Sequence, residues 1–338
     1  MKMIPGPSRE KVTSMAETAP LTSPSWTSRA LQAQAVPIGV ATVVLILVAS
    51  IFVPQVLTPA SLVAVIIPAA IMAIAAIGQT LVVQQKGIDL SVGGSMTLSA
   101  GIVATSTANG QSIWLGLVLA TIAAVVAGVA NGLLVTRLHI TPILATLASN
   151  SLLIGAVWTV SNGNAQTTPD ALRAVATGSA AGLPFIGWIA IVLVAGSSFV
   201  MAKSVYGRRF TAVGAAPEAA RASGTSVEVH VVSAYVASSI SGALAGLLLA
   251  AYAGQATYDL GNSYMLSIVA VVVIGGAVLS GGRGSITATA IAGVLLALVV
   301  QMVLTLGAPP STQLLVQSIV LGLAAVARLV PWTRFVRR

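Results

Sequence analysis

The sequence contains no cysteine, so disulfide bonds and thiolate metal sites are excluded. Only 7% of the 338 residues are charged, whereas a soluble domain carries about a quarter. Neither a G-x-x-x-x-G-K-[ST] phosphate loop nor a G-x-S-x-G nucleophile elbow occurs. The two histidines, His139 and His230, lie in unrelated segments without metal-ligand spacing. We therefore predict no catalytic residue, no metal site and no cofactor bound by this chain.

What the sequence has in abundance is apolar residues, which make up 57% of the chain. They gather in runs of about 17 to 23 residues, long enough to cross roughly 30 Å of membrane hydrocarbon as helices. The net charge of +9 is scattered between these runs and forms no single patch of the kind that binds nucleic acid. The composition therefore predicts an all-α integral membrane protein without a nucleic-acid partner.

The apolar runs predict about ten transmembrane helices. Their approximate ranges are 37–53, 61–83, 87–107, 113–135, 141–160, 184–202, 229–253, 264–279, 286–306 and 313–330. Residues 37–330 thus form one transmembrane domain. The preceding residues 1–36 are rich in Ser, Thr and Pro and are predicted to be a disordered tail, and residues 331–338 form a short basic tail.

The basic residues predict how the helices are oriented. An even number of spans places both termini on one side of the membrane, and loops rich in Lys and Arg stay in the cytoplasm. With the N-terminus inside, fifteen of the sixteen basic residues fall on the cytoplasmic side, and only Arg173 falls outside. We therefore expect cytoplasmic termini and cytoplasmic tails, and a cytoplasmic location for the polar segment 203–228.

That polar segment is the longest charged stretch between the apolar runs, and its sequence has the pattern of a short helix at about 216–223. Pro217 suits a first helical position, Glu218 complements the positive helix start, and Gly224 can adopt the left-handed stop. Arg221 follows Glu218 by three residues, so the two charges share one face. An ordinary interfacial helix between two spans and a helix that docks into a partner both fit this local pattern.

Carboxylates at mid-depth, which ion-driven transporters need, are not expected in the spans. Asp89 is expected near the cytoplasmic end of the third span, paired with Lys86 or capping the helix. Uncharged polar residues remain as candidates for a translocation path suited to a neutral polyhydroxylated solute, with helix-to-helix hydrogen bonding as the alternative for each. The candidates are Gln79, Asn131, Asn150, Ser151, Ser238, Ser239, Ser241 and Gln301.

Glycine spacing predicts close helix packing and one interrupted helix. Gly128 and Gly132 are four residues apart, as are Gly242 and Gly246, and we expect these pairs to pack within the chain rather than form a dimer seam. The eighth predicted span is short and rich in glycine, so a broken or re-entrant helix is expected there.

Three stretches of the chain stand out: GIDLSVGGSMTLSAG at 87–101, GRRFTAVGAAPEAARASG at 207–224 and IVAVVVIGGAVLSGGRGS at 268–285. In this order they resemble the permease subunits of bacterial ABC importers of the ribose, xylose, arabinose and galactose type. The resemblance covers about residues 40–330. Its motif positions are Gly87, Asp89, Ser91, Gly93, Gly281, Gly282, Arg283 and Gly284.

The resemblance implies a multi-pass permease of the bacterial inner membrane that imports a sugar. It implies a homodimer or a pair with a paralogue, an extracytoplasmic solute-binding protein, and a separate ATPase that binds ATP and magnesium. It also gives the short helix a coupling role toward the ATPase. The coupling candidates, with the two arginines also available to membrane lipid, are Arg208, Arg209, Glu218, Ala219, Ala220, Arg221 and Gly224.

Four residues of the outer loops are candidates for docking the binding protein: Asp170, Arg173, Tyr258 and Asp259. Other interpretations remain open from the sequence. A related permease for a nucleoside, a signalling furanone or a branched-chain amino acid would share this architecture. An ion-coupled secondary transporter and a structural membrane scaffold are the alternatives from other classes.

Overall fold

The computed structural model of the chain describes residues 35–309, 312, 315–319 and 322. Apart from Ala35 and Val36, the predicted tails at 1–36 and 331–338 lie outside these residues, as does most of the tenth predicted span. The described residues all belong to one structural unit, residues 34–338.

Helices dominate the described residues. In chain order they are α2 (Ala35–Phe52), the 3-10 helix η3 (Pro54–Leu57), α3 (Pro59–Gln84), α4 (Val92–Ala108), α5 (Ile113–Thr136), α6 (Pro142–Ser161), α7 (Asp170–Thr177), α8 (Phe185–Lys203), α9 (Val205–Ala215), α10 (Pro217–Ala222), α11 (Val227–Ala253), α12 (Asn262–Ile274) and α13 (Ile286–Thr305). Short antiparallel pairs join β1 (Gln166–Thr167) to β4 (Gln255–Ala256), and β2 (Ser179–Ala180) to β3 (Leu183–Pro184).

Local sequence explains where several helices begin. Thr58, Ser226 and Ser285 precede α3, α11 and α13, and each side chain accepts a hydrogen bond from a backbone amide of the first turn. Pro59 and Pro142 stand in the first turns of α3 and α6, where a missing N–H leaves no helical hydrogen bond unmade.

Seven of the described helices are long and apolar enough to cross a membrane: α2, α3, α5, α6, α8, α11 and α13. The predicted third span is only partly helical, because residues 87–91 enter the bundle as a loop before α4 begins at Val92. The predicted eighth span contains the 13-residue helix α12, which ends at Ile274 before the glycines. The structure thus supports an all-α membrane protein, and the full count of ten spans stays a prediction.

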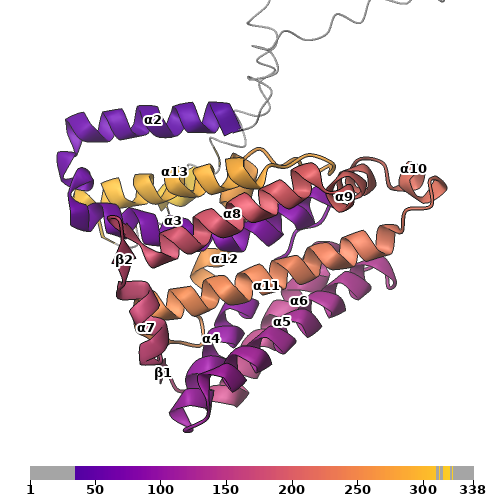
Figure 1. Cartoon of the computed structure of the whole chain (residues 1–338), viewed down its shortest axis with the longest axis horizontal. Coiled ribbons are helices and arrows are strands. Elements are labelled where there is room, and N and C mark those ends of the chain that lie inside the picture. The colour runs from indigo at the N-terminus through magenta and orange to yellow at the C-terminus, as the bar shows by residue number, and fades with distance from the viewer. Residues whose placement is uncertain (1–34, 310–311, 313–314, 320–321, 323–338) are drawn as a thin grey trace, which may run out of the picture. The chain divides into compact units, whose positions relative to one another are not determined.

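Helix α11 lies at the centre of the described unit, where it packs against α3, α4 and α5 (Figure 1). On one side, α13 and α8 pack against α3, and α2 packs against α13. On the other side, α6 packs against α4 and α5. Because α11 has 27 residues, it extends about 40 Å, from α10 at its first residue to β4 just after its last. We refer to these two extremities of the helices as the α10 end and the β4 end.

The paired glycines pack within the chain, as predicted. A Cβ atom on Gly128 would lie 2.5 Å from Cα of Val236, so α5 and α11 touch through their backbones. Further along α11, a Cβ on Gly246 would lie 2.1 Å from the carbonyl oxygen of Met96 in α4. Small residues therefore let α11 approach both neighbours closely.

Candidate functional site

Two short helices come between α8 and α11 in the chain: α9, which packs against the bundle, and α10, which projects from it (Figure 1). The sequence did not predict α9, which is anchored by the fully buried Phe210. This ring packs with Leu81, Val82 and Tyr235, and the side-chain amide of Gln85 donates to the Phe210 carbonyl at 2.9 Å. The segment that carries α10 is therefore held firmly against α3 and α11.

Helix α10 spans six residues where the sequence predicts a short helix, and its ends match the predicted signals. Pro217 stands at the first position, and Gly224 follows the helix with a φ of +78°. The amide of Thr225 donates to the Ala220 carbonyl, which closes the turn in the manner of a left-handed helix stop. Glu218 and Arg221 form an ion pair at 2.6 Å.

The two faces of α10 differ in what they expose. The Glu218 and Arg221 side chains are 85% and 58% exposed, and Ala219 and Ala222 lie beside them on the surface. Ala220, by contrast, is only 5% exposed and faces the bundle. Of the two alanines among the coupling candidates, Ala219 therefore lies on the outer face and Ala220 anchors the helix to the bundle.

A groove of about 750 Å³ lies beside α10, at the α10 end of the helices. Its walls come from Lys86 after α3, His139 before α6, the exposed side of α10 and the first turn of α11. Arg137 and Glu228 pair at 2.7 Å near its rim, where both side chains are well exposed and the pair contributes little stability. The groove is open, polar and large enough to accept side chains of another protein.

At the α10 end, the last residues of α3 and Lys86 meet two of the motif stretches, 207–224 and 268–285, which lie far apart in sequence. The amide of Gly282 donates to the Gln84 carbonyl at 2.9 Å, and the Gln84 side chain donates to the Gly284 carbonyl at 2.8 Å. Gly281, with a φ of +87°, leaves room for the Lys86 side chain and for the carbonyl of Gly214 in α9. Arg283 is exposed at the tip of this turn. The glycines therefore let three chain segments pack at backbone distance.

Asp89 does not pair with Lys86, which was one of the two roles expected for it. The Asp89 carboxyl is fully buried, and one oxygen accepts from the Ser91 amide at 2.8 Å and the Ser91 hydroxyl at 2.6 Å. In the described part of the chain its other oxygen has no hydrogen-bond partner. Asp89 thus lies inside the bundle rather than at its surface, because residues 87–91 fold inward.

Four of the path candidates take part in the packing of buried helices. In the orientation that satisfies both amide atoms, Gln79 donates to the Asp89 carbonyl at 3.0 Å and accepts from its amide at 3.3 Å. Asn131 donates to the Ser91 hydroxyl at 2.8 Å, and Asn150 accepts from the Gly94 amide at 2.7 Å. Ser238 is fully buried as well.

Ser239 and Ser241 also lie between helices: Ser239 is fully buried, and Ser241 donates to the Ala75 carbonyl of α3 at 3.3 Å. In the conformation described, these residues and the four above hold helices and the inward loop together. Gly93 belongs to the same region, because a Cβ there would lie 3.1 Å from the Gly261 carbonyl.

Gln301 and Ser151 differ from the buried candidates. Gln301 lines a cavity of about 420 Å³, together with Tyr252, Tyr264, Ser267 and Gln317. Ser151 lies on the exposed face of α6. Both can therefore contact a solute or a second subunit without the bundle being opened.

Comparison with known proteins decides the family. Residues 61–325 match the family described as "Branched-chain amino acid transport system / permease component". A ribose import permease of Bacillus subtilis is 33% identical over 84% of this chain and 89% of its own length. A ribose import permease of Haemophilus influenzae is 27% identical over 85% and 91%. An autoinducer 2 import permease of Photorhabdus luminescens is 31% identical over 64% and 66%.

The chain belongs to this permease family. No solved structure matches it. Since the match covers α3 through α13, it includes all three motif stretches and α10.

At the β4 end, the permease gathers the four residues proposed for binding-protein docking. Asp170 and Arg173 lie exposed on α7, and the pairing of β1 with β4 brings this segment close to Tyr258 and Asp259. The Tyr258 ring packs against Trp158 with centroids 5.1 Å apart. The docking role itself stays a prediction.

The sequence did not predict the contribution of α9 and of Gln84, Gln85 and Tyr235 to the α10 end. Gln84 and Gln85 follow a long apolar run, and this polar pair at a helix end was the available signal. Tyr235 gave no signal in the sequence because it lies within a predicted apolar span. Its hydroxyl lies beside Gly87, where a side chain would clash with it.

Proposed function

We propose that this chain is the membrane-spanning permease subunit of an ATP-driven importer that moves a sugar across the bacterial cytoplasmic membrane. One observation carries the proposal: two distant motif stretches meet the end of α3 at one end of the bundle, and the exposed helix α10 projects from that end. A protein without a phosphate loop needs another subunit to supply energy, and α10 is built to receive that subunit.

In the complete importer, α10 docks on a separate ATPase that binds ATP and magnesium. Glu218, Ala219 and Arg221 form the contact surface, while Ala220 and Gly224 fix the helix and its exit. Movement of α10 reaches the spans through α9, because Phe210 is packed against α3 and α11. Arg208 and Arg209, exposed on α9, face acidic groups of the ATPase or of the membrane surface.

The charge distribution supports cytoplasmic termini and a cytoplasmic α10. Among the described residues, the α10 end holds every Lys and Arg except Arg173, which lies toward the β4 end. Such an asymmetry is what retention of basic loops in the cytoplasm produces. In this orientation the solute-binding protein docks at the β4 end. The translocation pathway is completed by ten spans and by a second copy of the chain or a paralogue.

A sugar is favoured over the other solutes because the two ribose permeases match this chain over about nine tenths of their length. The autoinducer 2 permease matches over 66% of its length. The solute is best determined on the binding protein. A screen of its ligands against ribose, other pentoses, autoinducer 2 and branched-chain amino acids separates these alternatives.

Reconstitution tests the proposal. The purified permease is placed in proteoliposomes with its ATPase, and the binding protein and labelled sugar are added on the β4 side. We expect uptake that requires ATP and all three components. Uptake by the permease alone, driven by a proton or sodium gradient, would instead support a secondary transporter and refute the proposal.

A further inference from the structure

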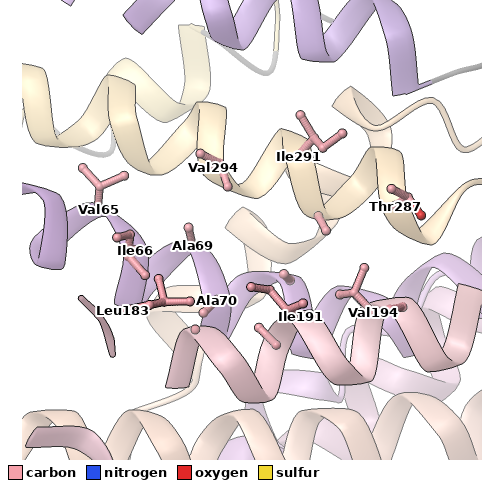
Figure 2. A pocket seen from close by; sticks show the side chains of 15 residues that line it. Val65, Ile66, Ala69, Ala70, Leu183, Ile191, Val194, Thr287, Ile291 and Val294 are labelled. Carbon is pink, nitrogen blue, oxygen red and sulfur yellow. The ribbon is translucent and has the colours of Figure 1, made fainter. Parts of the chain in front are cut away.

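An apolar groove runs along the membrane-facing side of the bundle, between α8 and α13 with α3 as its floor (Figure 2). Its volume is about 490 Å³. Aliphatic side chains such as Ile66, Ile191, Val194 and Ile291 line it, and Thr287 supplies the one hydroxyl among the lining residues. The groove therefore offers contacts to hydrocarbon along its length and a polar atom at one end.

A second, polar pocket of about 260 Å³ shares Thr287 with the groove. It lies at the α10 end of α8 and α13, and Ser198, Thr211 and Ser285 contribute hydroxyl groups to it. Because Ser198 and Thr287 share one hydrogen bond at 3.0 Å, one of their two hydroxyl hydrogens stays available to a ligand. Groove and pocket thus adjoin at Thr287, the groove apolar and the pocket polar.

The polar pocket has donors for an anion and one acceptor for a hydroxyl. The amides of Ile286 and Thr287, in the first turn of α13, have no hydrogen-bond partner in the described part of the chain. Gln84, only 6% exposed, also lines the pocket, and its side-chain oxygen has no partner among the described residues. A buried acceptor of this kind costs free energy unless a ligand or water donates to it.

Two cations, Lys203 and Arg208, belong to the segment that directly follows lining residues of the polar pocket. The Arg208 guanidinium donates to the Lys203 carbonyl at 3.2 Å, directly after Met201 and Ala202, which line the pocket. Among the described residues, carboxylates pair only with Arg137 and Arg221, so Lys203 and Arg208 keep their charge free for another anion.

We propose that this site binds one anionic phospholipid whose headgroup carries a hydroxyl, as phosphatidylglycerol does. An acyl chain lies in the groove, and the phosphate lies at the start of α13 near Lys203 and Arg208. From Ser198 to Gly187 the axis of α8 rises about 16 Å, which is close to half of the roughly 30 Å hydrocarbon thickness. The site therefore spans one leaflet, the cytoplasmic one if α10 faces the cytoplasm.

A transmembrane helix of a second copy fits the site less well. A helix is about 10 Å across, and its backbone carries no anion for the free amides at the start of α13. An acyl chain is narrower, and only a lipid joins hydrocarbon to a phosphate at the boundary of the membrane. The groove and the free cations together select lipid over protein.

Native mass spectrometry of the purified full chain tests the proposal, with titration of phosphatidylglycerol and phosphatidylcholine. We expect one tightly retained phosphatidylglycerol per chain and a preference over phosphatidylcholine of at least about tenfold. The groove-filling variant Ala195→Phe should lose both lipids. The variant Lys203→Gln with Arg208→Gln should bind the two lipids nearly equally.

Matched controls keep the test decisive. Val192→Phe adds the same ring on α8 outside the groove, and Arg209→Gln removes a neighbouring charge, so both should retain the wild-type preference. If Ala195→Phe does not fold, Ala290→Phe fills the groove from α13. Equal binding of both lipids by the wild-type chain, or competition by glycerol phosphate as strong as by the lipid, would overturn the proposal. The proposal would also be overturned if a groove-filling variant changed the oligomeric state of the permease but still retained lipid.

Discussion

At the residue scale, buried polar groups decide which side chains support the site. Asp89, Ser91 and Asn131 form a connected set of hydrogen bonds between the inward loop and α5. Gln79 holds the same loop from α3 by bonding to the Asp89 backbone. Because an unmade hydrogen bond in such a place costs more than a made one contributes, the loop depends on each member.

Substitutions of Asp89 test whether this residue acts through its oxygen atom or its charge. Asp89→Asn keeps an acceptor for the Ser91 amide and hydroxyl, so we expect a small change in stability. Asp89→Ala leaves both donors buried and unpaired, and should lower the free energy of unfolding by about 2 to 4 kcal/mol. Thermal unfolding in detergent measures both. Equal damage by the two variants would show that the negative charge itself is needed.

At the element scale, close contact between helices sets what each face of α11 tolerates. At Gly246 the backbone of α4 comes so near that a methyl group has no space. Gly246→Ala should cost about 1 to 3 kcal/mol and lower the unfolding midpoint by roughly 2 to 8 °C. The matched variant Gly155→Ala lies on α6, where no atom lies within 4 Å of the added carbon, and should leave the midpoint unchanged. Equal midpoints for both variants would refute the packing argument.

Charge reversal tests the role of α10. Glu218→Lys should leave membrane insertion intact and reduce ATP-driven uptake at least about tenfold, because the exposed charge would face the ATPase with the wrong sign. The double variant Glu218→Lys with Arg221→Glu restores the pair within the helix in reversed order. It should remain impaired.

Recovery in the double variant would mean that the intrahelical pair matters and partner recognition does not. Uptake that is unaffected by Glu218→Lys alone would contradict the coupling role altogether. Both variants are measured in the same reconstituted system, with the amount of inserted permease as the control.

At the scale of the whole molecule, composition and patterning predicted the class of protein, and tertiary contacts set the details. Long apolar runs predicted α2, α3, α5, α6, α8, α11 and α13 within a few residues. The local signals of Pro217 and Gly224 predicted α10. These features depend on neighbours in sequence, so the sequence alone could show them.

Features that depend on contacts between distant segments could not be predicted in this way. Hydropathy placed Asp89 at a helix entrance, but hydrogen bonds from Ser91 and Gln79 draw the loop inside. Ala220 and Ala219 look alike in sequence, and only the packing of α10 buries one and exposes the other. The path candidates likewise could not be separated into buried and accessible residues before their partners were known.

The side of the membrane on which α10 lies is the central claim, and cysteine labelling tests it most directly. Because the chain has no native cysteine, Ala222→Cys on the exposed face of α10 and Asp259→Cys at the β4 end each give a single reactive site. In intact cells, a membrane-impermeant maleimide should label Asp259→Cys and should reach Ala222→Cys only after permeabilisation. Labelling of Ala222→Cys from outside intact cells would contradict the account.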